Sequence, residues 1–133
     1  MADAVTTQII HDGDRQVVMK FTNISDGTGE AAVQKVDVST LQPESRTGRV
    51  CTEVAISRIY YDLSGMSVDI LWDATVDALC LSLSSQGVFD FRDTGPLTNN
   101  AGAGVTGDIN FTTTGAGLGD RYFVMLVMDK KYV

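Results

Sequence analysis

Three glycines in the last third of the chain come nearest to a known chemical motif. Gly102, Gly104 and Gly107 have the GxGxxG spacing of dinucleotide-binding loops. That mechanism needs a parallel strand before the glycines and a helix after them, whose N-terminus holds the pyrophosphate. Here two asparagines precede the glycines, and residues 108–113 alternate as a strand. We therefore expect turns at these glycines and no cofactor.

The single histidine, His11, limits acid–base, nucleophilic and metal chemistry. A serine or cysteine nucleophile needs a base, and His11 stands at the end of a predicted strand, where we expect an exposed side chain. Four turn acids could form a calcium site if their loops converge, but they lack EF-hand spacing, and turn hydrogen bonds are the simpler interpretation. They are Asp12, Asp14, Asp26 and Glu30. We expect no catalytic, cofactor-binding or metal-binding residues, and no enzyme.

Two acid pairs could in principle hydrolyse a glycosidic bond. Asp69 with Asp73, or Asp90 with Asp93, would need a cleft and one raised pKa, and we interpret them as solvated loop acids.

Aromatic residues in the middle of the chain could instead bind sugar by stacking. Trp72, Tyr60 and Tyr61 are candidates for such a platform. Trp72 ends an alternating apolar run, which is more typical of a core residue. A carbohydrate- or receptor-binding sandwich stays open as an alternative.

The elements that would position these residues are strands. Period-two alternation or β-branched composition marks residues 5–11, 15–24, 31–38, 51–61, 66–72, 79–84, 108–113 and 122–128. In residues 31–38 the apolar side chains change from one face of the strand to the other near Gln34, where we expect a bulge. Leu79, Leu81 and Leu83 are expected on one face of their strand. Glycines 115, 117 and 119 are expected in a hairpin connection. The pattern predicts one all-β domain over residues 1–133. Its fold would be an antiparallel β-sandwich of eight to nine strands, with the jelly roll as one form.

Composition narrows the classes of partner. The 133 residues carry 17 acids and 10 bases, a formal charge of −7. This disfavours nucleic acid and anionic membrane as partners. The first eight residues lack the regions of a secretory signal, and the longest apolar run is too short for a bilayer span. Cys51 and Cys80 are expected to be buried small hydrophobes, with a disulfide as the open alternative.

One strand is apolar on both faces. Along residues 122–127, Tyr122, Val124 and Leu126 alternate with Phe123, Met125 and Val127. Only one face of a small sandwich can point into its core, so the other should meet a second layer, a subunit or a partner. A central strand covered by a loop would give the same pattern.

Several stretches together resemble a family of small structural proteins encoded by tailed bacteriophages. They are MADAVT at residues 1–6, VMKFTNISDGTGE at 18–30, LWDAT at 71–75, FDFR at 89–92 and NNAGAGVTGD at 99–108. The resemblance covers nearly the whole chain. It implies a virion component without catalytic residues, assembled in the host cytoplasm.

Within that family setting, the expected role is a capsid decoration (cement) protein. Such a protein would form homo-oligomers, with a trimer as one form, bind the major capsid protein and stabilise the lattice through many modest contacts. A neck or tail component would have a similar sequence.

Overall fold

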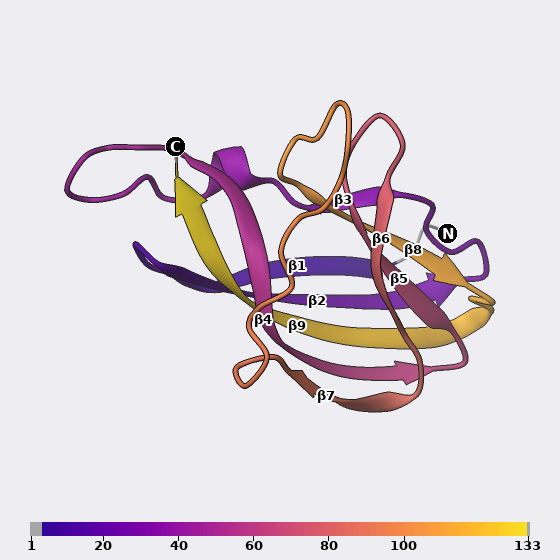
Figure 1. Cartoon of the computed structure of the whole chain (residues 1–133). Helices are drawn as coiled ribbons and strands as arrows, with labels where there is room; N and C mark the ends of the chain where they lie inside the picture. Colours follow the sequence, from indigo (N-terminus) through magenta and orange to yellow (C-terminus); the bar gives the residue numbers. More distant parts are fainter. Residues whose placement is uncertain (1–3, 133) are drawn as a thin grey trace.

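The computed structural model of the protein describes residues 4–132, which form nine strands and one short 3₁₀ turn (Figure 1). The strands are β1 (Ala4–Asp12), β2 (Gln16–Asp26), β3 (Val33–Val36), β4 (Cys51–Ser64), β5 (Ser67–Trp72), β6 (Ala78–Leu83), β7 (Gln86–Asp90), β8 (Ile109–Thr114) and β9 (Leu118–Tyr132). The turn, η1 (Val38–Thr40), is capped by the Asp37 carboxylate, which accepts from the backbone N–H of Ser39. The all-β class and the number of strands are confirmed.

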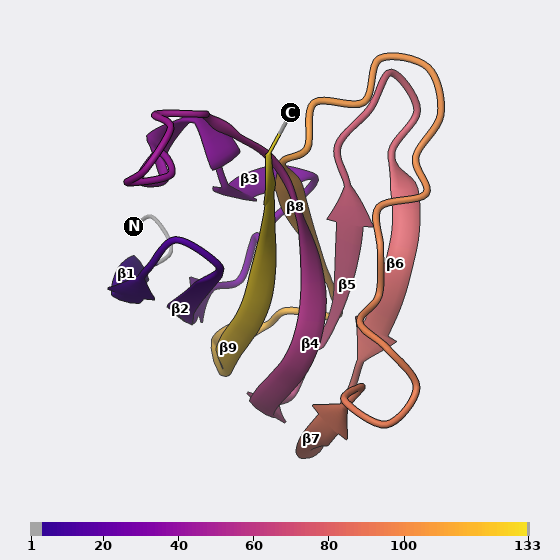
Figure 2. The ribbon, with the colours of Figure 1, turned by 60° about the vertical axis from the view of Figure 1, so that its left-hand side comes forward.

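The strands form two antiparallel sheets packed face to face (Figures 1 and 2). One sheet has the order β1-β2-β9-β4-β7 and the other has the order β3-β8-β5-β6. Strand β5 pairs with β6, β4 with β7, β3 with β8 and β2 with β9, so the chain is one long hairpin rolled around its β5–β6 tip. This nested pairing in two sheets is the jelly roll. Strand β1 lies outside the nested pairs and joins β2 as a hairpin.

Alternate side chains of both sheets fill the core, as the period-two pattern predicts. Val17, Met19 and Phe21 of β2 are at most 4% exposed. The Phe21 ring meets the ring of Phe111, from the opposite sheet, edge to face at a centroid distance of 5.1 Å. Because a fully buried apolar side chain of this size contributes about 1.5–3 kcal/mol, this layer supplies most of the drive for the sheets to pack.

A buried ion pair also joins the two sheets. The Lys35 Nζ of β3 lies 2.5 Å from the Glu30 Oε2, and these side chains are 2% and 5% exposed. The Tyr122 hydroxyl of β9 donates to the Glu30 Oε1 at 2.6 Å. The carboxylate therefore ties β3 to the central region of the other sheet.

The glycine spacing that could have indicated a nucleotide site belongs to a loop between β7 and β8. Gly104 and Gly107 have φ of +78° and +88°. A Cβ on Gly104 would collide with the Thr75 hydroxyl, and one on Gly107 with the carbonyl oxygen of Thr52. Both positions therefore require glycine for backbone shape and close approach. Strand β8 follows at Ile109, so the expected turn is confirmed.

Two details of the strand prediction were wrong. Strands β8 and β9 belong to different sheets, so the glycine turn between them carries the chain across the sandwich and does not close a hairpin. Leu79 is 56% exposed, because the β5–β6 register shifts between Leu81 and Leu79. This bulge turns Leu79 away from the core and leaves Cys80 and Leu81 packed against it. The bulge expected near Gln34 is present between Gln34 and Val36.

Candidate interaction surfaces

His11 stands at the end of β1 with an exposed side chain, as expected. The described part of the chain contains no group of three His, Cys, Asp or Glu side chains placed to hold a metal ion. It also contains no helix long and apolar enough to cross a membrane.

The turn acids make hydrogen bonds and ion pairs of their own. The Asp26 carboxylate accepts from the backbone N–H and the hydroxyl of Thr28, which is the expected turn interaction. Asp12 accepts from the Lys130 ammonium at 2.6 Å, and Asp14 accepts from the backbone N–H of Ser45. Their loops do not converge on a common centre.

The acid pairs are engaged in similar local contacts. Asp69 accepts from the Ser82 hydroxyl, and Asp73 accepts from the Thr106 hydroxyl and the Asn110 amide. The Arg92 guanidinium donates to Asp90 and lowers the pKa of that carboxyl to about 2. A glycosidase acid needs a shift in the opposite direction.

The aromatic residues proposed as a platform do not share a surface. Trp72 is 1% exposed and belongs to the core. Tyr61 points to the inner side of β4, and Tyr60 lies on the outer side, where its hydroxyl accepts from Arg58. Tyr61 instead joins a row that the sequence reasoning missed. Its ring stacks on Phe89 at 5.5 Å.

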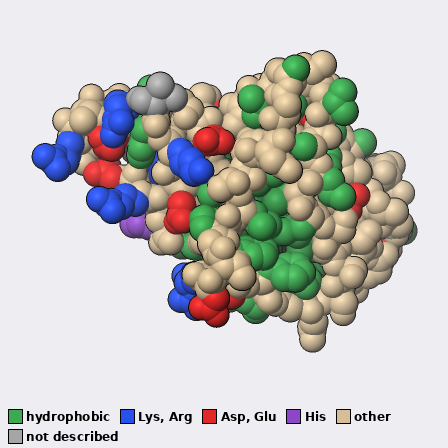
Figure 3. All heavy atoms as spheres, in the orientation of Figure 1, with side chains coloured by type: hydrophobic (Ala, Val, Ile, Leu, Met, Phe, Trp, Pro, Cys, Tyr) green, Lys and Arg blue, Asp and Glu red, His purple; other side chains and the backbone are tan. Residues whose placement is uncertain are grey.

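The aromatic row continues from Phe89 to Phe91, with a centroid distance of 5.9 Å and an interplanar angle of 17°. Figure 3 shows apolar side chains gathered on this side of the molecule, beside β6 and above β7. The Phe89 side chain is 36% exposed, but the rings of Tyr61 and Phe91 both stack against its ring. Tyr61 and Phe91 are half-buried and pack against the core, so Phe89 is the member of the row most open to solvent.

Both cysteines are free thiols. Cys51 is buried in β4, and burial raises the pKa of Cys80 in β6 to about 12. Cys51 is buried as expected, whereas Cys80 is half-buried and packs against the core, and the disulfide alternative is wrong.

The outer face of the five-stranded sheet is apolar along its middle. Phe123, Met125 and Val127 of the central strand β9 point outward, and the first two are half-buried. In register beside them lie Val18, Ile24, Tyr60 and Val88. Ile24 is 43% exposed and Val88 is 56% exposed. Strand β9 is a central strand, as one of the two interpretations of its sequence predicted. That interpretation expected a loop over its outer residues, whereas side chains of β2 and β4 lie beside them.

A hollow of about 430 Å³ lies at one end of this face. Phe123, Ile24 and Arg121 line it, together with polar side chains of β1, β2 and β4. The apolar row therefore follows β9, and Lys20, Arg58 and Asp62 lie directly beside it in register. Apolar and charged side chains alternate across many protein–protein contacts in the same way.

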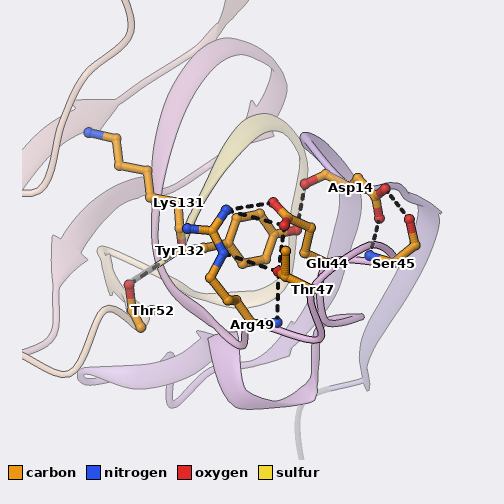
Figure 4. A network of polar contacts seen from close by, with 8 residues as sticks. All are labelled: Asp14, Glu44, Ser45, Thr47, Arg49, Thr52, Lys131 and Tyr132. Carbon is orange, nitrogen blue, oxygen red and sulfur yellow. Dashed lines mark hydrogen bonds and ion pairs between the residues drawn. The ribbon is translucent and has the colours of Figure 1, made fainter.

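A network of charged and polar side chains lies at the end of the molecule opposite to this hollow, around the 41–50 loop (Figures 3 and 4). Arg49 donates to both carboxylate oxygens of Glu44 and lies 5.8 Å from the Tyr132 ring centroid. The Tyr132 hydroxyl donates to the backbone carbonyl of Asp14, and Ser45 donates to the Asp14 carboxylate. These bonds tie the loop to the β1–β2 turn and to the end of β9, so we interpret the network as structural.

Strand β1 is the most exposed strand of the fold. Every described side chain from Val5 to Ile10 is exposed, including Val5 at 42% and Ile9 at 45%. The sequence reasoning identified this strand but not its edge position. The sequence AVTTQII, which has no polar–apolar alternation, was the available signal.

No protein-family model matches the sequence, and no curated protein does. Among solved structures, a family 29 carbohydrate-binding module is similar with a TM-score of 0.41 and 9% identity, over 95% of this chain and 88% of that one. A point mutant of a family 29 module gives the same TM-score and identity, over 95% of this chain and 92% of that one. Similarity at this level supports no argument about function.

Proposed function

We propose that this chain is a non-enzymatic structural protein of a bacteriophage virion, a decoration (cement) protein that associates with itself and binds the capsid lattice. The apolar outer face of the five-stranded sheet supports the proposal most strongly. A jelly roll is a rigid slab, and an apolar sheet face that no other described layer covers is suited to adhesion. The resemblance of the sequence to virion structural proteins supplies the setting.

Charge on the outer face supports the same proposal. Four bases and four acids lie on it, as the strand register places them: Lys20, Arg58, Arg121 and Lys131 with Glu53, Asp62, Asp90 and Asp129. This face therefore lacks the negative surplus that gives the chain its formal charge of −7. A capsid subunit can approach it with less electrostatic repulsion than it would meet elsewhere on the surface.

Co-sedimentation with expanded capsids of the encoding phage tests the proposal. Val88→Asp places a charge at an exposed position of the outer face, and we expect it to weaken capsid binding by roughly tenfold or more. Val76→Asp is the matched control, because Val76 is 82% exposed in a loop between β5 and β6. Wild-type protein that does not bind capsids would refute the proposal, and equal binding by both variants would exclude the outer face as the contact.

A neck or tail component is the alternative within the same class. Quantitative mass spectrometry of purified virions separates the two, because a decoration protein is present in hundreds of copies and a neck or tail piece in a few.

Carbohydrate binding is the second candidate, favoured by the stacked row of Tyr61, Phe89 and Phe91, of which Phe89 is exposed. Glycan-array binding that Phe89→Ala removes, with the fold intact, would support it. A silent array would exclude it for the glycans displayed.

A further inference from the structure

Strand β1 leaves an unusual edge on the five-stranded sheet. Val5, Thr7 and Ile9 pair with Asn23, Phe21 and Met19 of β2, whose side chains point into the core. The three β1 side chains therefore lie on the core side of the sheet, yet all are exposed. Figure 2 shows the reason: β1 is the outermost strand, on the side away from β5 and β6, and it extends beyond the second sheet.

The edge of β1 also lacks the usual protection against pairing with another chain. Exposed edges are normally short, charged, interrupted by proline or covered. Strand β3 has four residues and carries Lys35, and β7 has five and ends at Asp90. Strand β6 has the 94–100 segment beside it, since the two line a common hollow. Residues 5–10 of β1 contain no charge, proline or glycine, and its bulge against β2 lies toward the end of the strand, between Ile9 and His11.

We propose that β1 pairs antiparallel with β1 of a second copy of this chain, which makes one continuous ten-stranded sheet across a twofold axis. The proposal names the self-association surface of the proposed function and rests on it only for its biological role. The resemblance allows a trimer, but an unpaired strand edge fits a twofold dimer better. In such a dimer the same edge of each copy makes the contact.

The sequence of β1 selects one register for this pairing. With the axis at Thr7, each Val5 faces Ile9 of the other copy, Thr6 faces Gln8, and Thr7 faces its own counterpart. Apolar side chains then meet apolar ones, and polar side chains meet polar ones. Moving the axis to Thr6 or Gln8 places Thr7 opposite Val5 or Ile9, which mismatches polarity.

Charge also favours a second copy of this chain as the partner of β1. Two copies of a chain with a formal charge of −7 repel each other over most of their surfaces. The uncharged stretch of β1 is a place where they can approach without bringing like charges together. Pairing would also place the exposed Val5 of one copy against the exposed Ile9 of the other, which removes apolar surface from water.

The position at the axis allows a charge-swap test. Thr7→Lys and Thr7→Glu each bring two like charges together in a homodimer, whereas an equimolar mixture brings opposite charges together. By sedimentation equilibrium, wild-type protein should give twice the 14.3 kDa mass of one chain. We expect each variant alone to raise the dimer dissociation constant roughly ten- to a hundredfold, and the mixture to restore dimers. Thr114→Lys is the matched control, since Thr114 is an exposed strand threonine in β8, which belongs to the other sheet.

Several results would overturn the inference. They are a monomeric wild type, a Thr7→Lys variant as dimeric as wild type, a mixture that stays monomeric, or a trimer insensitive to Thr7. Circular dichroism and Trp72 fluorescence of each variant confirm that the fold is intact. Capsid co-sedimentation of the same variants is a separate readout, so a failure of β1 pairing is distinguishable from a failure of capsid binding.

Discussion

The ion pair between Glu30 and Lys35 makes a quantitative prediction about stability. In Lys35→Met the long side chain is replaced by an apolar one of similar length, and the Glu30 carboxylate loses the ammonium 2.5 Å from its Oε2. The carboxylate stays at 5% side-chain exposure, so water cannot replace the lost partner without a local opening of the fold.

The magnitude follows from what remains around the carboxylate. Removing one partner of a buried ion pair costs about 3–5 kcal/mol, because the other charge is left uncompensated. The Tyr122 hydroxyl and the Asn23 amide still donate to Glu30, at 2.6 and 3.4 Å. We therefore expect a loss near the lower end, about 3 kcal/mol. That is a large part of the roughly 5–15 kcal/mol of a typical domain and corresponds to a fall in Tm of roughly 10 °C.

Urea unfolding followed by tryptophan fluorescence measures this loss. Trp72 is the single tryptophan and is 1% exposed, so its emission reports the opening of the core. Lys20→Met is the matched control, because Lys20 lies half-buried on the outer face of β2 and takes part in none of the ion pairs between described residues. Its free energy of unfolding should stay within about 0.5 kcal/mol of wild type.

A double-mutant cycle decides whether the loss comes from the pair. Glu30→Gln alone leaves Lys35 buried without its counter-charge, whereas Glu30→Gln with Lys35→Met removes both charges. The double variant should be more stable than the sum of the single losses predicts, by at least about 1 kcal/mol. A loss below about 1 kcal/mol for Lys35→Met, or strictly additive losses, would refute the reasoning.

Three further predictions concern other parts of the fold. With a pKa near 12, Cys80 should react with iodoacetamide at pH 8 roughly a thousandfold more slowly in the folded protein than in urea, and equal rates would contradict its burial. The Arg92 guanidinium holds the pKa of Asp90 near 2, so the pair stabilises the fold above about pH 4 and this contribution is lost as the pH falls toward 2. An NMR titration of the Asp90 carboxyl with a midpoint near 4 would disprove this. Gly107→Ala should cost about 2–3 kcal/mol in urea unfolding, because its Cβ meets the Thr52 carbonyl and its φ is positive, and a loss below 1 kcal/mol would show that the loop yields.

Much of the fold could be predicted from sequence because alternation reports which side of a strand is buried. Val17, Met19 and Phe21 show this pattern, and all three are in the core. Where a bulge interrupts the pleat, alternation predicts the wrong face, and Leu79 is the example. The error arises because a bulge adds one residue to one strand only, which local composition does not reveal.

The candidate surfaces were harder to predict than the strands, because exposure depends on which strands become neighbours. The double apolar pattern at Phe123 and Met125 fits a central strand with an apolar outer face. The missing alternation in residues 4–10 is the one local sign that β1 is an edge strand, and its neighbours come from the pairing order of the whole chain. The aromatic row has the same origin, because Tyr61 and Phe89 meet only when β4 pairs with β7.

The nested strand pairing has a consequence for how the chain folds. The β5–β6 pair joins neighbours in sequence, whereas β2 and β9 must close a loop of about a hundred residues before any of their contacts form. Because entropy opposes long closures, local hairpins should order first and the outer pair last. We expect refolding on the millisecond-to-second scale, typical of β-sandwiches. Until β9 is inserted between β2 and β4, the edges of both strands are open, so this is the stage at which a crowded refolding mixture is most prone to aggregate.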